Sequence, residues 1–178
     1  MAIGYINSDG STYKIKYTMD GAKIKYTQLS GYSGGLVGIR YVGYFNDDLN
    51  WFATATPHGD TNILDQIDGF SSSFDYSQEE LYSWEWNGFF KPSSTEVYTF
   101  YTSSDDASYL WIDNILVVNN GGLHGNVEQS GVISLTAGIY YPIKIQFGEN
   151  TGGDTMTVNF SSYTIPKTTD GNGYYYHI

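Results

Sequence analysis

The chain of 178 residues lacks cysteine and has only four prolines. Only 15% of its residues are charged. Without cysteine there can be no disulfides, zinc–thiolate centres or cysteine nucleophile. Positive charge is scarce: eight lysines and arginines face 19 acidic residues, giving a net charge of −11. This balance argues against binding to nucleic acids and anionic lipids, which need a basic surface. No apolar run approaches the roughly 20 residues of a membrane span, and residues 1–10 lack a secretory-signal pattern.

What the chain does contain is aromatic residues and glycine: 18 tyrosines, nine phenylalanines, four tryptophans and 21 glycines. This composition is typical of short strands joined by turns, and long helix-forming stretches are missing. We therefore predict an all-β sandwich or barrel, with a long loop-rich segment at 46–83 that includes one helical turn near 78–82. Strands are expected at 36–45, 82–90, 97–102, 109–112, 115–118, 132–135, 140–147 and 155–160, with the tryptophans at 84, 86 and 111 in the core.

The first 30 residues form a unit of their own. Two alternating stretches flank Asp20-Gly21, a dipeptide that favours a tight hairpin turn. We expect Tyr13, Ile15 and Tyr17 on the inward face of this hairpin and its lysines on the outward face. Half of the cations lie here, at positions 14, 16, 23 and 25. They either protect a solvated edge from aggregation or mark the hairpin as the attachment point to a larger, acidic assembly.

Two oxygen-rich loops are candidates for chemistry. Asp105 and Asp106 follow one predicted strand and precede the next. Adjacent carboxylates at a strand end repel each other unless a cation holds them, and calcium takes six to eight hard oxygen ligands. The second loop, at 148–154, supplies carboxylates, an amide oxygen and carbonyls freed by glycine flexibility. The aspartate pair is either a plain surface turn or, if both loops meet at one end of the sandwich, part of a calcium cage.

Several blocks of sequence keep a characteristic order: 35–38 with Tyr41, 84–89, 98–113 with its Ser-Asp-Asp-Ala-Ser motif, 117–120 and 134–145. In these blocks the chain resembles the PA14 domain, a β-sandwich module of bacterial toxins, glycosidases, yeast flocculins and bacterial adhesins. The resemblance covers residues 35–163 and implies an antiparallel β-sandwich with long loops. It leaves residues 1–34 as an N-terminal β-hairpin extension for attachment, and residues 164–178 as a C-terminal tail or last strand.

The resemblance also implies a calcium site. In lectin-like members of the family, an Asp-Asp pair joined by a cis peptide bond binds calcium, and the ion coordinates sugar hydroxyls. Carried onto this sequence, the pair is Asp105-Asp106, and the second loop contributes the Asn150 side chain with carbonyls from around Gly152 and Asp154. The Asp154 carboxylate is an additional candidate. The expected metal ligands are thus Asp105, Asp106, Asn150, Gly152 and Asp154.

The expected calcium site also indicates which residues would contact a sugar. Asp105, Asp106 and Asn150 would share the ion with sugar hydroxyls, and an aromatic face would cover the apolar side of the ring. Rings in predicted loops belong to His124, Trp51, Phe52 and Tyr32. We expect His124 and Trp51 to contact the sugar ring, although each could instead simply fill space in the core or on the surface.

An enzyme is not expected. The three histidines are scattered, and no His-Glu-x-x-His motif occurs. The sequence predicts a Ca²⁺-dependent glycan-binding module that mediates adhesion to cell-surface sugars and is exposed outside the cell or on a surface. It is expected neither to bind nucleic acid nor to insert into a membrane. The alternative is a non-catalytic structural component of a phage virion or surface assembly, with the N-terminal hairpin as its docking element.

Overall fold

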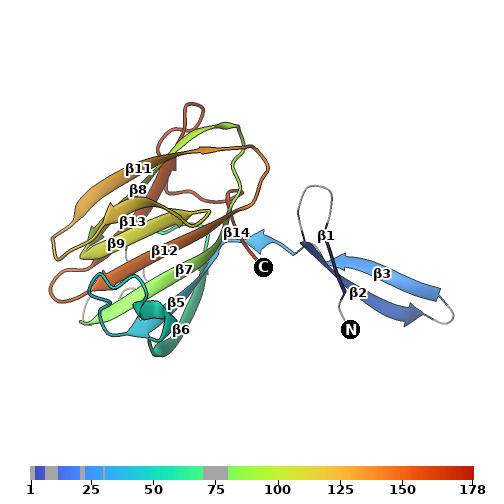
Figure 1. Cartoon of the computed structure of the whole chain (residues 1–178), viewed down its shortest axis with the longest axis horizontal. Helices are drawn as coiled ribbons and strands as arrows, with labels where there is room; N and C mark the ends of the chain where they lie inside the picture. The colour runs from blue at the N-terminus through green and yellow to red at the C-terminus, as the bar shows by residue number, and fades with distance from the viewer. Residues whose placement is uncertain (1–2, 7–11, 21–22, 30, 70–79) are drawn as a thin grey trace.

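Antiparallel strands are almost the only regular elements of the computed structural model, which describes residues 3–6, 12–20, 23–29, 31–69 and 80–178 (Figure 1). An eight-stranded sheet contains β4 (Ser33–Gly34), β5 (Leu36–Val42), β6 (Pro57–Leu64), β7 (Tyr82–Phe90), β9 (Ala107–Ile112), β10 (Ile115–Asn120), β12 (Tyr141–Glu149) and β14 (Tyr175–His177). A three-stranded sheet faces it and contains β8 (Glu96–Asp105), β11 (Val127–Leu135) and β13 (Thr155–Ser161). The predicted antiparallel β-sandwich is confirmed.

The strand order brings distant segments together. In the large sheet the order is β10-β9-β12-β7-β14-β4, while β5 also pairs with β7 and carries β6 beside it. In the small sheet β8 lies between β11 and β13. Because β8 ends at Asp105 and β9 begins at Ala107, the chain crosses from one sheet to the other at the aspartate pair.

The main core lies between the two sheets and follows the alternation of the strands. Trp84 and Trp86 of β7 are buried and stack with 5.4 Å between ring centroids. Phe90 of the same strand packs on Phe100 and Phe160 of the small sheet, at 5.0 and 5.2 Å. Trp111 does not join this core. It lies on the outer face, only partly buried, with the Lys144 ammonium 4.1 Å from its ring centroid.

A second apolar cluster covers part of the outer face of the large sheet. Tyr41 and Tyr109 occupy outer positions there, and Phe45 and Phe52 pack on them from the segment that follows β5. Phe52 belongs to a short 3₁₀ helix, η1 (Trp51–Ala53). The described part of the segment expected to be loop-rich therefore contains η1 and strand β6. Of the helical turn expected near 78–82, residues 80–82 are described and are not helical, because β7 begins at Tyr82; residues 78 and 79 lie outside the described residues.

Both ends of the chain contribute strands. The N-terminal region is a three-stranded sheet of β1 (Ile3–Ile6), β2 (Thr12–Asp20) and β3 (Lys23–Leu29), with Asp20 opposite Lys23 as the predicted turn requires. The expectation of only two strands was wrong because β1, with four residues, is too short to show an alternating pattern of its own. At the other end, β14 pairs with β7 and β4 as a last strand of the large sheet.

Gly131 of β11 marks a close approach between the sheets. A Cβ at this position would collide with the carbonyl oxygen of Val117 in β10. Because that obstacle is main chain, it cannot rotate away, and we expect Gly131→Ala to lower the free energy of unfolding by about 3 kcal/mol. Urea denaturation measures the loss. The neighbouring Ser130→Ala, at an exposed position, should change it by less than about 0.5 kcal/mol; equal stability of the two variants would contradict the close approach.

Candidate metal centre

Several strand ends meet at one end of the sandwich. There, Glu149 at the end of β12 lies opposite Tyr82 at the start of β7, and Thr155 at the start of β13 lies opposite Asp105 at the end of β8. The β12–β13 loop therefore reaches the β8–β9 crossing. The two oxygen-rich loops of the sequence lie at the same end of the sandwich.

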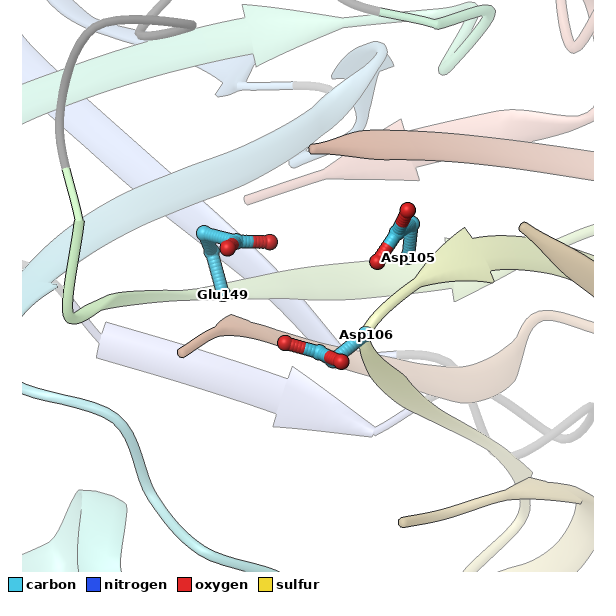
Figure 2. Close-up of side chains that lie close together, drawn as sticks. All are labelled: Asp105, Asp106 and Glu149. Atoms are coloured by element: carbon cyan, nitrogen blue, oxygen red, sulfur yellow. The ribbon is translucent and has the colours of Figure 1, made fainter. Parts of the chain in front are cut away.

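Three carboxylates gather at this point (Figure 2). Asp105, Asp106 and Glu149 each place one oxygen within 4.8 Å of the others. The peptide bond between the two aspartates is cis. Asp106 is 5% exposed and Glu149 only 1%, whereas Asp105 is partly exposed. Like charges this close and this buried are unfavourable unless a proton or a cation neutralises them.

The unfavourable electrostatic energy of this cluster falls mainly on the Glu149 carboxylate. Within the described part of the chain, neither of its carboxylate oxygens has a hydrogen-bond partner. Burial raises the pKa of Glu149 to about 8, and the charges of Asp106, Asp105 and Asp154 add to the effect. Burial and Asp106 likewise raise the pKa of Asp105, with His124 opposing them. A buried, unpartnered carboxylate is costly, and three converging carboxylates are the hard oxygen donors that Ca²⁺ prefers. The residues present fit such a cation.

Asp106 also ties two loops to the centre. Its Oδ1 accepts a hydrogen bond from the backbone N–H of His124, and its Oδ2 accepts one from the backbone N–H of Asn150, both at 3.0 Å. The loops touch Asp105 as well: a Cβ on Gly153 would lie 3.4 Å from the Asp105 Oδ2. The aspartate pair is thus bordered by the β10–β11 and β12–β13 loops.

The other predicted ligands surround the three carboxylates without joining the cluster. The Asn150 carbonyl accepts a hydrogen bond from the backbone N–H of Leu81 at 3.1 Å. The backbone N–H of Gly152 donates to Glu80 at 2.9 Å, and Asp154 accepts the Tyr82 hydroxyl at 2.5 Å. Their roles as metal ligands remain predictions.

The predicted sugar-contacting rings lie in different places. Both ring nitrogens of His124 are near carbonyl oxygens of its own loop, those of Gly125 and Asn120, at 3.0 and 3.3 Å. Trp51 lies in η1, and its ring contacts are with Tyr41 and Phe52 of the second apolar cluster. Of the further candidates, Phe52 is buried in that cluster.

Tyr32 lies beside the end of β7 that is opposite to the carboxylate cluster. It contacts Phe89 edge-on at 5.1 Å and stacks on Tyr140 at 3.8 Å. This position, next to the last strand β14, makes Tyr32 part of the opposite end of the sandwich. It is therefore not placed to cover a sugar at the carboxylate cluster.

Glu149 was not among the ligands predicted from the sequence, although a signal for it was present. Ile143, Ile145 and Phe147 point into the core at every second position of β12. The same period of two places Glu149 on the buried face. A second missed residue is Tyr44, whose hydroxyl is buried without a partner in the described structure and whose pKa is raised by burial and by nearby carboxylates, including Asp106.

The sequence profile of the PA14 domain matches residues 31–174 of this chain. The chain belongs to the PA14 domain family. No described helix is long and apolar enough to cross a membrane.

Two characterised relatives contain a similar segment. Anti-sigma-I factor RsgI3 of Acetivibrio thermocellus is 33% identical over 89 residues, which are 50% of this chain and 14% of that protein. Protective antigen of Bacillus anthracis is 32% identical over 111 residues, 60% of this chain and 13% of that protein. The matched segments of this chain thus span about one seventh of each of these much longer proteins.

Solved structures share the fold at lower identity. The Epithelial Adhesin 6 A domain of Candida glabrata, in complex with Galb1-3GlcNAc, superposes with a TM-score of 0.69 at 16% identity, covering 84% of this chain and 89% of that one. A PA14 sugar-binding domain from an RTX adhesin gives a TM-score of 0.67 at 17% identity, with 82% and 99% covered. At these identities the similarity establishes the fold.

Proposed function

We propose that this PA14 domain binds carbohydrate through a calcium ion held by Asp105, Asp106 and Glu149. The observation that carries the proposal is the Glu149 carboxylate, which is 1% exposed, lacks a hydrogen-bond partner among the described residues and faces the aspartate pair. Such a group requires neutralisation. The oxygen donors around it match calcium chemistry.

The arrangement leaves one side of the centre accessible to a ligand. Glu149 and Asp106 lie buried beneath it, while Asp105 is partly exposed between the two bordering loops. Calcium, when bound, supplies coordination positions that neighbouring sugar hydroxyls fill in place of water. Asn150, the Gly152 carbonyl and Asp154 complete the ligand set in this proposal, and His124 borders the sugar.

Adhesion to cell-surface glycans follows from the same proposal. The Candida glabrata domain was crystallised with a galactoside, and the RTX adhesin domain is described as sugar-binding. These similarities support a non-catalytic binding module that acts outside the cell or on a surface. Open sugar sites bind weakly one at a time, so adhesion of this kind depends on several sites acting together.

A glycan array tests the proposal directly. The protein is applied with calcium and again with EDTA, beside Asp105→Asn and the matched control Asp113→Asn in the turn after β9. We expect defined glycan binding that EDTA and Asp105→Asn abolish and that Asp113→Asn retains. Binding that survives both EDTA and Asp105→Asn would show that the sugar is held without the ion, and absence of binding to any glycan would refute carbohydrate recognition.

A further inference from the structure

The register of the N-terminal sheet separates its residues into two unlike faces. Residues opposite each other in neighbouring strands share a face, and alternate residues along a strand do so too. Ile15 lies opposite Ile3 in β1, and Tyr17 lies opposite Tyr26 in β3. Eight of the nine paired positions on this face are apolar or aromatic: Ile3, Tyr5, Tyr13, Ile15, Tyr17, Met19, Ile24 and Tyr26, the ninth being Gln28.

All four lysines of the sheet fall on the other face. Lys14 is opposite Gly4, and the partners of the remaining lysines are Thr27, Thr18 and Asp20, all in the same alternation. The strand register therefore makes the sheet amphipathic. It has one face without a charged position and one that carries every lysine of the first 30 residues.

A single sheet with one apolar face needs a second layer. Elements of this kind are stable when the apolar face is buried against another sheet or a helix. None of the described sandwich strands pairs with β1, β2 or β3. In Figure 1 the N-terminal sheet stands clear of the sandwich, beyond the end at which β4 and β14 lie. The described chain thus provides one layer of a two-layer structure.

We propose that a second copy of the chain provides the other layer, with the apolar faces of the two N-terminal sheets packed together. Tyrosine side chains bury about 150 Å² or more each. Four of the eight apolar positions are tyrosines, and together with three isoleucines and one methionine they are enough for the roughly 800 Å² per partner of a standard protein interface. The association is self-complementary, as a two-fold dimer requires, and it keeps the lysine faces of the two copies apart.

The dimer would leave the candidate metal centre free. Strand β7 begins at Tyr82 beside that centre and ends at Phe90, which pairs with Tyr175 of β14. At about 3.3 Å per residue the strand separates the two ends of the sandwich by about 26 Å. The N-terminal sheet joins at the far end, through Tyr32. Two copies associated there would present two centres at once, the arrangement that gives weak binding sites avidity.

Sedimentation equilibrium of the full chain tests the dimer, with two variants of the central strand. Ile15→Glu and Lys16→Glu introduce the same residue at adjacent positions, but on opposite faces of the sheet. We expect the wild type and Lys16→Glu to sediment at twice the chain mass of 19.9 kDa, and Ile15→Glu at the chain mass. A monomeric wild type, or equal behaviour of the two variants, would overturn the proposal.

Hydrogen exchange tests the dimer on the wild type alone, so the result does not depend on whether a variant folds. In a dimer, amide exchange in residues 12–29 should slow as the protein concentration rises. Protection that does not depend on concentration would mean that the sheet packs on its own sandwich, where a hollow of about 540 Å³ on the outer face is lined by Val37, Phe89 and Trp111 among others. That result would also overturn the proposal.

Discussion

Calcium added to metal-free protein is expected to raise the melting temperature by about 5–10 °C. A ligand at about 100 times its dissociation constant adds about 2.7 kcal/mol to the free energy of unfolding, and a domain of this length shifts by about 2–4 °C per kcal/mol. The physical reason is the cluster of Asp105, Asp106 and Glu149, whose mutual repulsion the ion removes. Thermal unfolding with increasing calcium measures the shift.

Matched variants identify the source of this stabilisation. Asp105→Asn should abolish the calcium shift, whereas Asp113→Asn, an equal change of charge in the turn after β9, should preserve it. Magnesium should act more weakly because it demands near-ideal octahedral geometry and releases its water reluctantly. No shift in protein first stripped of metal would refute the calcium site.

Metal-free protein is expected to become less stable as the pH rises from about 4.5 to about 8. The pKa of Glu149 is raised from 4.5 to about 8 in the folded state. Between these values the folded protein binds more protons than the unfolded chain, so the free energy of unfolding falls by up to about 1.4 kcal/mol per pH unit. The raised pKa of Asp105 acts in the same direction. Urea denaturation across this range measures the slope.

Glu149→Gln separates this effect from the general acidity of the chain. Without a carboxyl group at position 149, the slope should flatten, and the metal-free protein at pH 8 should be more stable than the wild type. Glu128→Gln, at the surface where Glu128 pairs with Lys167, should keep the wild-type slope. Stability that instead rises with pH in metal-free wild type would show that Glu149 is ionised in the folded state at low pH.

Much of the fold and part of the site could be predicted from local sequence pattern. Alternating apolar residues mark strands such as β7 and β12, because successive side chains of a strand point to opposite faces. The Asp105-Asp106 pair was recognisable because adjacent carboxylates at a strand end repel each other unless a cation holds them, and because the surrounding motif resembles the PA14 domain. These features depend on neighbours in the chain, so the sequence by itself determined them.

What the pattern did not determine is which strands lie beside one another. Trp111 has the sequence context of a core residue, yet it lies on the outer face of the large sheet, where the Lys144 ammonium lies over its ring. The third strand of the N-terminal sheet was missed because a segment as short as β1 becomes a strand only when β2 lies beside it. In both cases packing or pairing with another segment overrides local preference.

The candidate metal centre shows the same division. The sequence alone identified two aspartates and an oxygen-rich loop, whereas the period that places Glu149 on the buried face of β12 was not recognised as pointing to a ligand. Only the tertiary structure decided that Glu149 faces the aspartate pair, because that depends on β12 lying between β7 and β9 and on its register with both. A carboxylate becomes a ligand through the groups opposite it, and these are set by long-range strand pairing.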